Sequence, residues 1–325
     1  RRLGVASIVE GSYRRTGDTV RVEVRLVSAE DGRVLWASGA DGRLTGSPID
    51  VQEALTCQVA AELRAELCGP GERISKRYTE NVAAYRAYLA GRYHWNRRWA
   101  EDLHRAVDRF EAAIAADPDY ALAWAGLAET YAVMEVNSVV PPQSVAGKGE
   151  AAARRALQLD DSLASAWAAL GLLRNCAWDW AESELLLGRA LELNPDYAVA
   201  RMWYANGVLL TRGRFDEAEA ELKRALENDP LSVSISNNLA ELYVYRRQYD
   251  RAIAQARATL EINPGPGNAY WILARSYLAL GRTEEAREAA ARSGFEEANG
   301  WLQLHASGRR EEERRYLDDL ARSPA

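Results

Sequence analysis

Residues 161–195 read DSLASAWAALGLLRNCAWDWAESELLLGRALELNP, and this stretch decides the fold. Trp167 and Gly171 stand four residues apart, which places both on one face of a helix. A second apolar pattern follows and reaches Ala190 shortly before Pro195 closes the stretch. The pattern predicts two helices joined by a turn, and the proline starts the next turn, where no helical N–H is needed.

The same stretch recurs along the chain. Its closing positions are separated by 43, 34, 35 and 34 residues, and they are Pro118, Asp161, Pro195, Pro230 and Pro264. Small residues five positions earlier keep the same step, and they are Ala113, Ala156, Ala190, Ala225 and Thr259. The period therefore does not depend on proline alone. A period near 34 residues indicates an array of helix pairs, because one pair cannot bury its apolar face without neighbours.

The repeated pattern resembles the tetratricopeptide repeat, whose signature is Trp-x2-Leu-Gly-x2-Tyr followed by Ala-x3-Phe-x2-Ala-x4-Pro. The signature positions are filled by Pro118, Trp124, Leu127, Trp167, Leu170, Gly171, Ala190, Pro195, Ala225, Pro230, Pro264 and Tyr270. The resemblance implies a mainly α fold, an α-solenoid in which helix pairs stack into a right-handed superhelix. We expect the small residues to let helices approach closely and the aromatic residues to fill the space toward the next pair.

We expect this array to cover residues 81–325 with about six to seven helix pairs. The first copy has a lengthened turn at 95–99, and the second has extra residues at 136–144. A last pair at 298–320 contains the polar segment 309–315. Such a polar pair would suit the solvated cap that the end of a solenoid requires.

The first 72 residues show a different period. Residues 19–26 alternate apolar and charged side chains, which predicts a strand with one wet face. Residues 5–13 and 33–38 are rich in β-formers and predict two further strands. Turn residues at 16–18 and 29–32 separate the three, so we expect an antiparallel meander. Apolar residues every four positions over 51–67 then predict a helix that covers one face of this sheet.

This region resembles the back half of the TolB-like amino-terminal domain of multidomain bacterial signalling proteins. The matching segments are 3–5, 9–12, 15–18, 31–33 and 35–37. We therefore predict a partial, apparently truncated α/β domain at 1–72 and a linker at 73–80, before the repeats at 81–325. The resemblance implies an upstream effector, such as a cyclase, a kinase or a winged-helix domain, so we expect this chain to be part of a longer protein.

Composition excludes several classes of protein. The 325 residues are 48% hydrophobic and 27% charged, which is unlike a disordered or collagen-like chain. A net charge of -6 argues against nucleic acid as the main partner. No stretch reaches the roughly 18 apolar residues of a membrane helix. Cys57, Cys68 and Cys176 show no framework spacing, which indicates a reducing compartment, so we expect a cytoplasmic protein.

We predict no catalytic residue, no cofactor and no metal site. The Gly-Lys-Gly segment at 147–149 superficially looks like a phosphate loop, but it lacks the first glycine and the Ser/Thr of that motif. His94 and His104 lie near Asp102 and Asp108 in sequence. Histidines satisfied on a helix surface are a simpler interpretation of them than metal ligands.

The first helix of each pair lines the inner groove of such an array, and residues off its packing stripe form the groove floor. We place Met202 and Tyr270 at signature positions. Trp203 and Trp271 directly follow them, so their side chains point about 100° away from the packing stripe. The predicted groove residues are Trp203, Gly207, Asn237, Glu241, Tyr245, Trp271 and Arg275, with an opening over Gly207. Aromatic area with amide and charged groups suits an extended peptide or a partner helix.

Alternatives stay open at both levels. Trp203 and Trp271 could instead fill a tightly wound superhelix, with Glu241 paired to Arg275. For the whole chain we predict a non-catalytic scaffold that binds a protein or peptide, in the regulatory part of a signalling protein. The alternatives are a small-ligand sensor that controls the upstream effector, an enzyme whose catalytic domain lies upstream, and a structural role in self-assembly.

Overall fold

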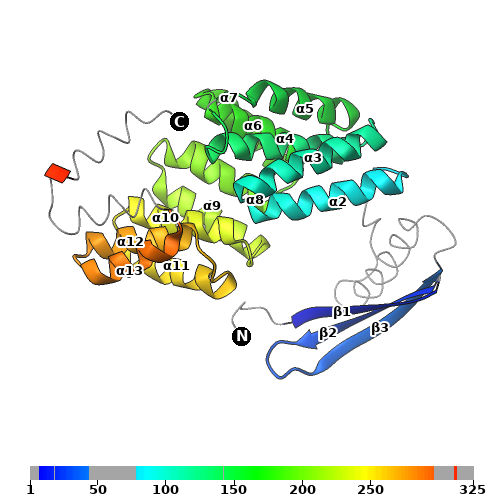
Figure 1. Cartoon of the computed structure of the whole chain (residues 1–325), viewed down its shortest axis with the longest axis horizontal. Coiled ribbons are helices and arrows are strands. Elements are labelled where there is room, and N and C mark those ends of the chain that lie inside the picture. Colours follow the sequence, from blue (N-terminus) through cyan, green and yellow to red (C-terminus); the bar gives the residue numbers. More distant parts are fainter. Residues whose placement is uncertain (1–6, 18, 44–77, 142, 296–310, 313–325) are drawn as a thin grey trace. The chain divides into compact units, whose positions relative to one another are not determined.

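A computed structural model describes residues 7–17, 19–43, 78–141, 143–295 and 311–312 (Figure 1). The chain divides into two compact units, Arg1–Leu127 and Ala128–Ala325, and each is described by itself. The predicted helix at 51–67 and most of the predicted linker lie outside the described residues. The predicted last pair at 298–320 also lies outside them, apart from a helical segment at 311–312.

The first unit contains a three-stranded antiparallel sheet of order β1-β2-β3, which confirms the predicted meander. Its strands are β1 (Ser7–Thr16), β2 (Thr19–Ser28) and β3 (Val34–Arg43). In β2 the buried side chains are Val24 and Leu26, two residues apart, as expected where alternate residues share one face. Thr16 pairs with Thr19, so a two-residue turn joins β1 to β2.

The first unit also holds the first helix pair, α2 (Val82–Arg97) and α3 (Ala100–Ala116). The side chain of Asn81 caps α2 by accepting from the backbone N–H groups of Ala83 and Ala84. Phe110 of α3 is fully buried. A Cβ added at Gly91 would lie 2.7 Å from its ring, so glycine is what lets the two helices approach.

From Ala146 onward, the second unit is a series of helices in which each contacts the next (Figure 1). The chain crosses from the first unit to the second within α4 (Ala121–Val136). The later elements are α5 (Ala146–Leu159), α6 (Ala164–Cys176), α7 (Trp180–Leu193), α8 (Ala198–Tyr204), η1 (Ala205–Leu210), α9 (Phe215–Asn228), α10 (Val233–Tyr245), α11 (Tyr249–Ile262), α12 (Asn268–Ala279) and α13 (Thr283–Ser293). This succession of helix pairs confirms the predicted mainly α repeat fold.

Small signature residues sit where helices meet most closely. Ala190 and Ala225 are fully buried in α7 and α9. A Cβ added at Gly171 of α6 would lie 2.6 Å from Cγ of Leu187 and 3.1 Å from its backbone nitrogen. Any side chain at position 171 would collide with the partner helix, so glycine there permits the close approach of α6 and α7.

Three hydrogen bonds of one kind fix the repeat register. Nε1 of Trp124 donates to the carbonyl oxygen of Pro118, and Nε1 of Trp167 donates to that of Asp161, each over 2.8 Å. Nε of Arg201 donates to the carbonyl oxygen of Pro195 over the same distance. Arg201 thus holds the signature position of its unit. The sequence-based placement of Met202 there was wrong by one residue.

The extra residue of the 35-residue interval lies in the π-helical segment η1 (Ala205–Leu210). Gly213, the left-handed residue of the following turn, stands 18 positions after Pro195. In the next unit the equivalent Arg247 stands 17 positions after Pro230. Since Arg201 keeps the normal spacing, the insertion falls between Arg201 and Gly213, and a π-turn absorbs one residue without ending the helix.

Deleting Gly207 should therefore be tolerated. The deletion restores a 34-residue interval and costs mainly the hydrogen bond from Asn175, because Thr211 also donates to the carbonyl oxygen of Val208. The melting temperature should therefore fall by no more than about 4 °C. Far-ultraviolet circular dichroism during heating measures this. As a matched control, deleting the buried Ala240 from α10 should prevent native folding, because it rotates the rest of a regular helix by about 100°. Equal damage from both deletions would contradict this account of η1.

Candidate partner-binding groove

The predicted groove residues lie on three successive first helices of the second unit. Trp203 is in α8 and Gly207 in η1. The others stand at intervals of four on their helices: Asn237, Glu241 and Tyr245 on α10, Trp271 and Arg275 on α12. Residues four apart share one helix face, so each set forms a stripe.

An ion pair joins the stripes of α10 and α12. Nη1 of Arg275 lies 2.5 Å from Oε1 of Glu241, and both side chains are about a quarter exposed. The pairing stated as an alternative is therefore present. It leaves these charges satisfied within the protein, and it fixes two neighbouring repeats to each other.

Tyr245 and Trp271 give this face its accessible aromatic area. Tyr245 is 55% exposed, and Trp271 is half-buried. Burial raises the pKa of the Tyr245 hydroxyl, and the adjacent negative charge of Glu241 raises it further. The hydroxyl is therefore a neutral group that can donate or accept a hydrogen bond at physiological pH.

Asn237 brings an unused hydrogen-bonding group to the same stripe. The residue is half-buried, and its Oδ1 has no hydrogen-bond partner among the described residues. Leaving a buried acceptor unpaired is costly. A local rearrangement that brings a donor to this oxygen would remove that cost.

Trp203 belongs to the interior. Its exposed fraction is 4%, and the corrected register makes Met202, not Trp203, the equivalent of Asn237 and Trp271. The prediction that Trp203 lines the groove is therefore wrong. Trp203 is a core residue, as the alternative interpretation stated. Met202 and Trp203 are both large and apolar, so residue type alone did not show which of them holds the equivalent position.

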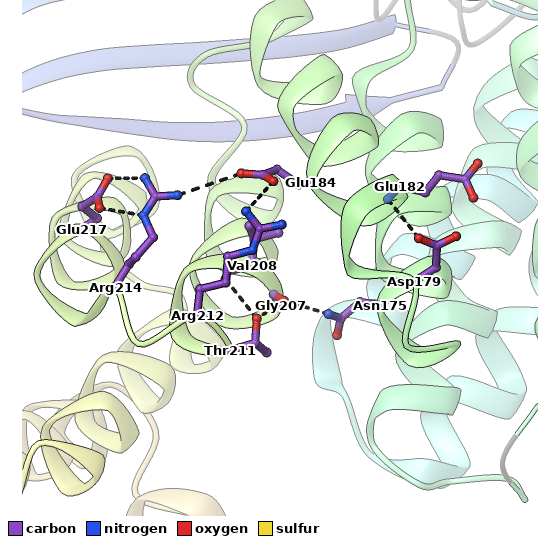
Figure 2. A network of polar contacts seen from close by, with 10 residues as sticks. All are labelled: Asn175, Asp179, Glu182, Glu184, Gly207, Val208, Thr211, Arg212, Arg214 and Glu217. Carbon is purple, nitrogen blue, oxygen red and sulfur yellow. Dashed lines mark hydrogen bonds and ion pairs between the residues drawn. The ribbon is translucent and has the colours of Figure 1, made fainter.

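The expected opening over Gly207 is filled. Nδ2 of Asn175 donates to the carbonyl oxygen of Gly207 over 2.8 Å, as Figure 2 shows. A Cβ added at Gly207 would lie 3.1 Å from the Asn175 side chain. The hydroxyl of Thr211 donates to the same carbonyl over 3.0 Å. The π-turn and its glycine thus serve a contact between α6 and η1, not a hollow.

A set of asparagines along these first helices was not predicted from the sequence. Nδ2 of Asn206 donates to Oδ1 of Asn238 over 2.6 Å, which links η1 to α10. Nδ2 of Asn238 in turn donates to the carbonyl oxygen of Ser234 over 2.8 Å. Together with Asn175, these amides tie repeat to repeat. Asn206 and Asn238 each stand one residue from a predicted groove residue, Gly207 and Asn237, and this was the available signal.

The edge of this region is held by ion pairs near the turn between η1 and α9. Arg212 lies 2.6 Å from Glu184 of α7, and Arg214 lies 2.5 Å from Glu217 (Figure 2). The Arg212–Glu184 pair joins α7 to the turn of the following repeat, and the Arg214–Glu217 pair lies at the start of α9. They contribute to the rigidity of the scaffold that carries the groove residues.

The other chemical candidates have structural partners. Nδ1 of His94 lies 2.8 Å from Asp102, and Nδ1 of His104 lies 2.8 Å from the carbonyl oxygen of Ala100. Burial, followed by the charge of Glu135, raises the pKa of Cys176 to about 11, so this thiol is not a reactive thiolate. Among the described residues, no group of three or more His, Cys, Asp or Glu side chains could hold a metal ion. Within that same part, no helix is long and apolar enough to cross a membrane.

Comparison with known proteins supports the repeat fold. Residues 179–236 and 237–295 each match a tetratricopeptide repeat family model. Among curated proteins, no sequence matches this chain. A structure of an IFIT1 monomeric mutant with m7Gppp-AAAA is similar to 82% of this chain at 19% identity, with a TM-score of 0.59. The chain covers 62% of that protein.

Two further structures show the same kind of likeness. The Cut9 and Hcn1 assembly of the APC/C matches 72% of this chain and 46% of its own, at 16% identity and a TM-score of 0.50. The tetratricopeptide repeat protein TTC0263 of Thermus thermophilus matches 61% of this chain and 99% of its own, at 20% identity and a TM-score of 0.49. The two family matches show that residues 179–295 are tetratricopeptide repeats, and the recurring helix pairs with their hydrogen-bonded register extend the same kind of fold to the other described helices.

Proposed function

We propose that this protein is a non-catalytic scaffold whose stripe on α10 and α12 binds an extended peptide segment of a partner protein. One observation carries the proposal: Asn237, Tyr245 and Trp271 share a face across two repeats that the Glu241–Arg275 ion pair fixes together. Aromatic side chains with few rotamers supply contact area, and the amide offers directed hydrogen bonds to a peptide backbone.

The rigidity of the stripe favours binding. The helices are already folded, so a partner does not have to order them, and only the peptide loses conformational freedom. The charges of Glu241 and Arg275 neutralise each other. The stripe therefore suits a segment that is uncharged where it crosses this pair.

Selection of binding peptides from a random displayed library, followed by calorimetry, tests the proposal. Trp271→Ala and Asn237→Ala should each weaken the selected peptides by roughly tenfold or more, since a central contact contributes at least about 1.4 kcal/mol. Phe215→Ala is the matched control, because it removes a half-exposed aromatic side chain from the start of α9, outside the stripe. It should leave the affinity within about twofold.

Melting temperatures near that of the parent protein show that the variants are folded. If Trp271→Ala and the parent protein bind the selected peptides with equal affinity, the proposal that this stripe binds the peptide is contradicted. A small metabolite that raises the melting temperature, with no peptide selected, would instead support the ligand-sensor alternative.

We also propose that the scaffold serves an upstream effector domain in a bacterial signalling protein. The support is the resemblance of residues 1–72 to the TolB-like domain, together with the three-stranded meander at the expected place. The reading frame that encodes the residues before Arg1 tests this directly. A frame without a cyclase, kinase or DNA-binding domain would contradict it.

A further inference from the structure

The turn between α6 and α7 exposes two tryptophans outside the stripe. Trp178 is 75% exposed, and Trp180 is 41% exposed. Their ring centroids lie 5.8 Å apart at an interplanar angle of 54°, so the two indoles form a tilted pair. Exposed aromatic area of this kind is unusual on a surface without a binding role.

The backbone makes Trp178 an unfavourable choice for this turn. Its φ is +64°, in the left-handed region. The equivalent positions of the following units are Gly213, Arg247 and Gly281, with φ between +57° and +73°. Glycine adopts this conformation readily, whereas a residue with a Cβ does so at a cost. Since the ring is mostly in solvent, burial does not offset that cost.

Hydrogen bonds hold the turn in one conformation. The N–H of Trp178 donates to the carbonyl oxygen of Asn175 over 3.0 Å, and the N–H of Asp179 donates to that of Arg174 over 2.9 Å. The carboxylate of Asp179 accepts from the N–H of Glu182 over 3.1 Å, as Figure 2 shows. A partner would therefore meet preformed rings, and little ordering cost would oppose binding.

Three carboxylates lie near the turn in sequence, and two of them are neutralised by arginines. Glu182 and Glu184 pair with Arg174 and Arg212 at 2.9 and 2.6 Å. For Asp179, between the two tryptophans, no ion pair is found within the described residues. A carboxylate that has no ion pair and stands between two exposed indoles in sequence favours a cationic partner.

The same protein stacks guanidinium groups on aromatic rings at related places. Arg251 lies 4.1 Å from the ring centroid of Tyr243, and Arg282 lies 4.6 Å from that of Tyr277. In the part of the chain that the structure describes, no guanidinium covers Trp178 or Trp180. Their faces are free to accept one from another molecule.

We propose that Trp178, Asp179 and Trp180 form a docking point for an arginine side chain of a partner protein. The guanidinium stacks on an indole face and pairs with the Asp179 carboxylate. Arginine fits better than lysine, because its planar group stacks on a ring and is less strongly hydrated. The carboxylate disfavours an anionic lipid surface, and this site is separate from the stripe of α10 and α12.

Calorimetric titration with a peptide of alternating arginine and glycine tests the proposal. Trp178→Gly should lower the affinity at least tenfold without lowering the melting temperature, because glycine relieves the left-handed backbone. Arg247→Gly is the matched control at the same backbone position two units later, and it should bind within twofold of the parent protein. Asp179→Asn, which keeps the helix cap, should also weaken binding, and a glutamate–glycine peptide should not bind.

Three results would overturn the docking point. The first is an unchanged affinity of Trp178→Gly, which would place peptide binding elsewhere on this acidic protein. The second is concentration-dependent sedimentation of the parent protein that Trp178→Gly abolishes, because the tryptophans would then join two copies. The third is a melting temperature of Trp178→Gly well below that of Arg247→Gly, because the ring would then stabilise the fold.

Discussion

Gly171→Ala should destabilise the repeat array by about 2–3 kcal/mol, whereas Gly188→Ala should stabilise it by up to about 1 kcal/mol. At position 171 the added Cβ would lie 2.6 Å from Cγ of Leu187 and 3.1 Å from its backbone nitrogen. Leu187 is fully buried, so α6 and α7 must move apart to relieve the contact. At position 188 of α7 no heavy atom lies within 4 Å of an added Cβ.

The two substitutions add the same methyl group to neighbouring helices, so their comparison separates helix propensity from packing. Urea unfolding followed by circular dichroism measures the free energy of unfolding of both variants. The stability of Gly188→Ala should equal or exceed that of the parent protein. Loss of stability by both variants, or by neither, would show that close approach at Gly171 is not what selects glycine there.

The repeat period and its packing residues could be predicted from the sequence because they follow from spacing. Gly171 and Ala190 recur at fixed distances from Pro195 and lie where helices meet. The three strands were predictable for a similar reason. Apolar and charged residues alternate over 19–26, and this period of two is typical of a strand with one face in solvent. Both kinds of pattern are repeated or regular, so no single residue decides them.

The register of the fourth unit, between Pro195 and Pro230, could not be predicted in the same way. The 35-residue interval reveals one extra residue, but the sequence at 205–210 contains no helix breaker other than one glycine. Trp203 and Met202 are both large and apolar, so either could hold the packing position. The hydrogen bond from Arg201 to Pro195 decides it, and an arginine at that position is not part of the signature.

The candidate groove was predicted in part for the same physical reason. On α10 and α12, which are separated by a regular 34-residue step, Tyr245 and Trp271 are at least partly exposed and the Glu241–Arg275 pair is present. At η1 the π-turn shifts the face, and Gly207 meets Asn175 instead of solvent. A one-residue insertion is therefore enough to move predicted groove residues into the core.

Glu219→Gln should have the largest effect among single charge changes, because Glu219 of α9 connects several positive groups. Its carboxylate lies 2.9 Å from Nζ of Lys223, 2.9 Å from Nη1 of Arg246 and 2.6 Å from Nη2 of Arg251. The side chain is only 13% exposed. The cluster thus links α9 to α10 and α11 at a site with little solvent screening.

The pKa of Glu219 reports how strongly the charged form is favoured. Burial alone would raise this pKa, but hydrogen bonds from Lys223 and Arg251, and then their charges, outweigh burial and lower it to about 2. The folded-state pKa is below the usual value of 4.5. The carboxylate therefore contributes stability above the unfolded-state pKa, and this contribution is lost as the pH falls from about 4.5 toward about 2.

Glu219→Gln should consequently cost up to about 3 kcal/mol near neutral pH, and the cost should shrink steadily below about pH 4.5. Urea unfolding of both proteins across this pH range measures the difference. Glu217→Gln is the matched control on the same helix, because Glu217 is mostly exposed and Arg214 is its one ion-pair partner among the described residues. Its removal should therefore change the stability little. A difference for Glu219→Gln that stays constant with pH would mean that shape, and not charge, explains the role of Glu219.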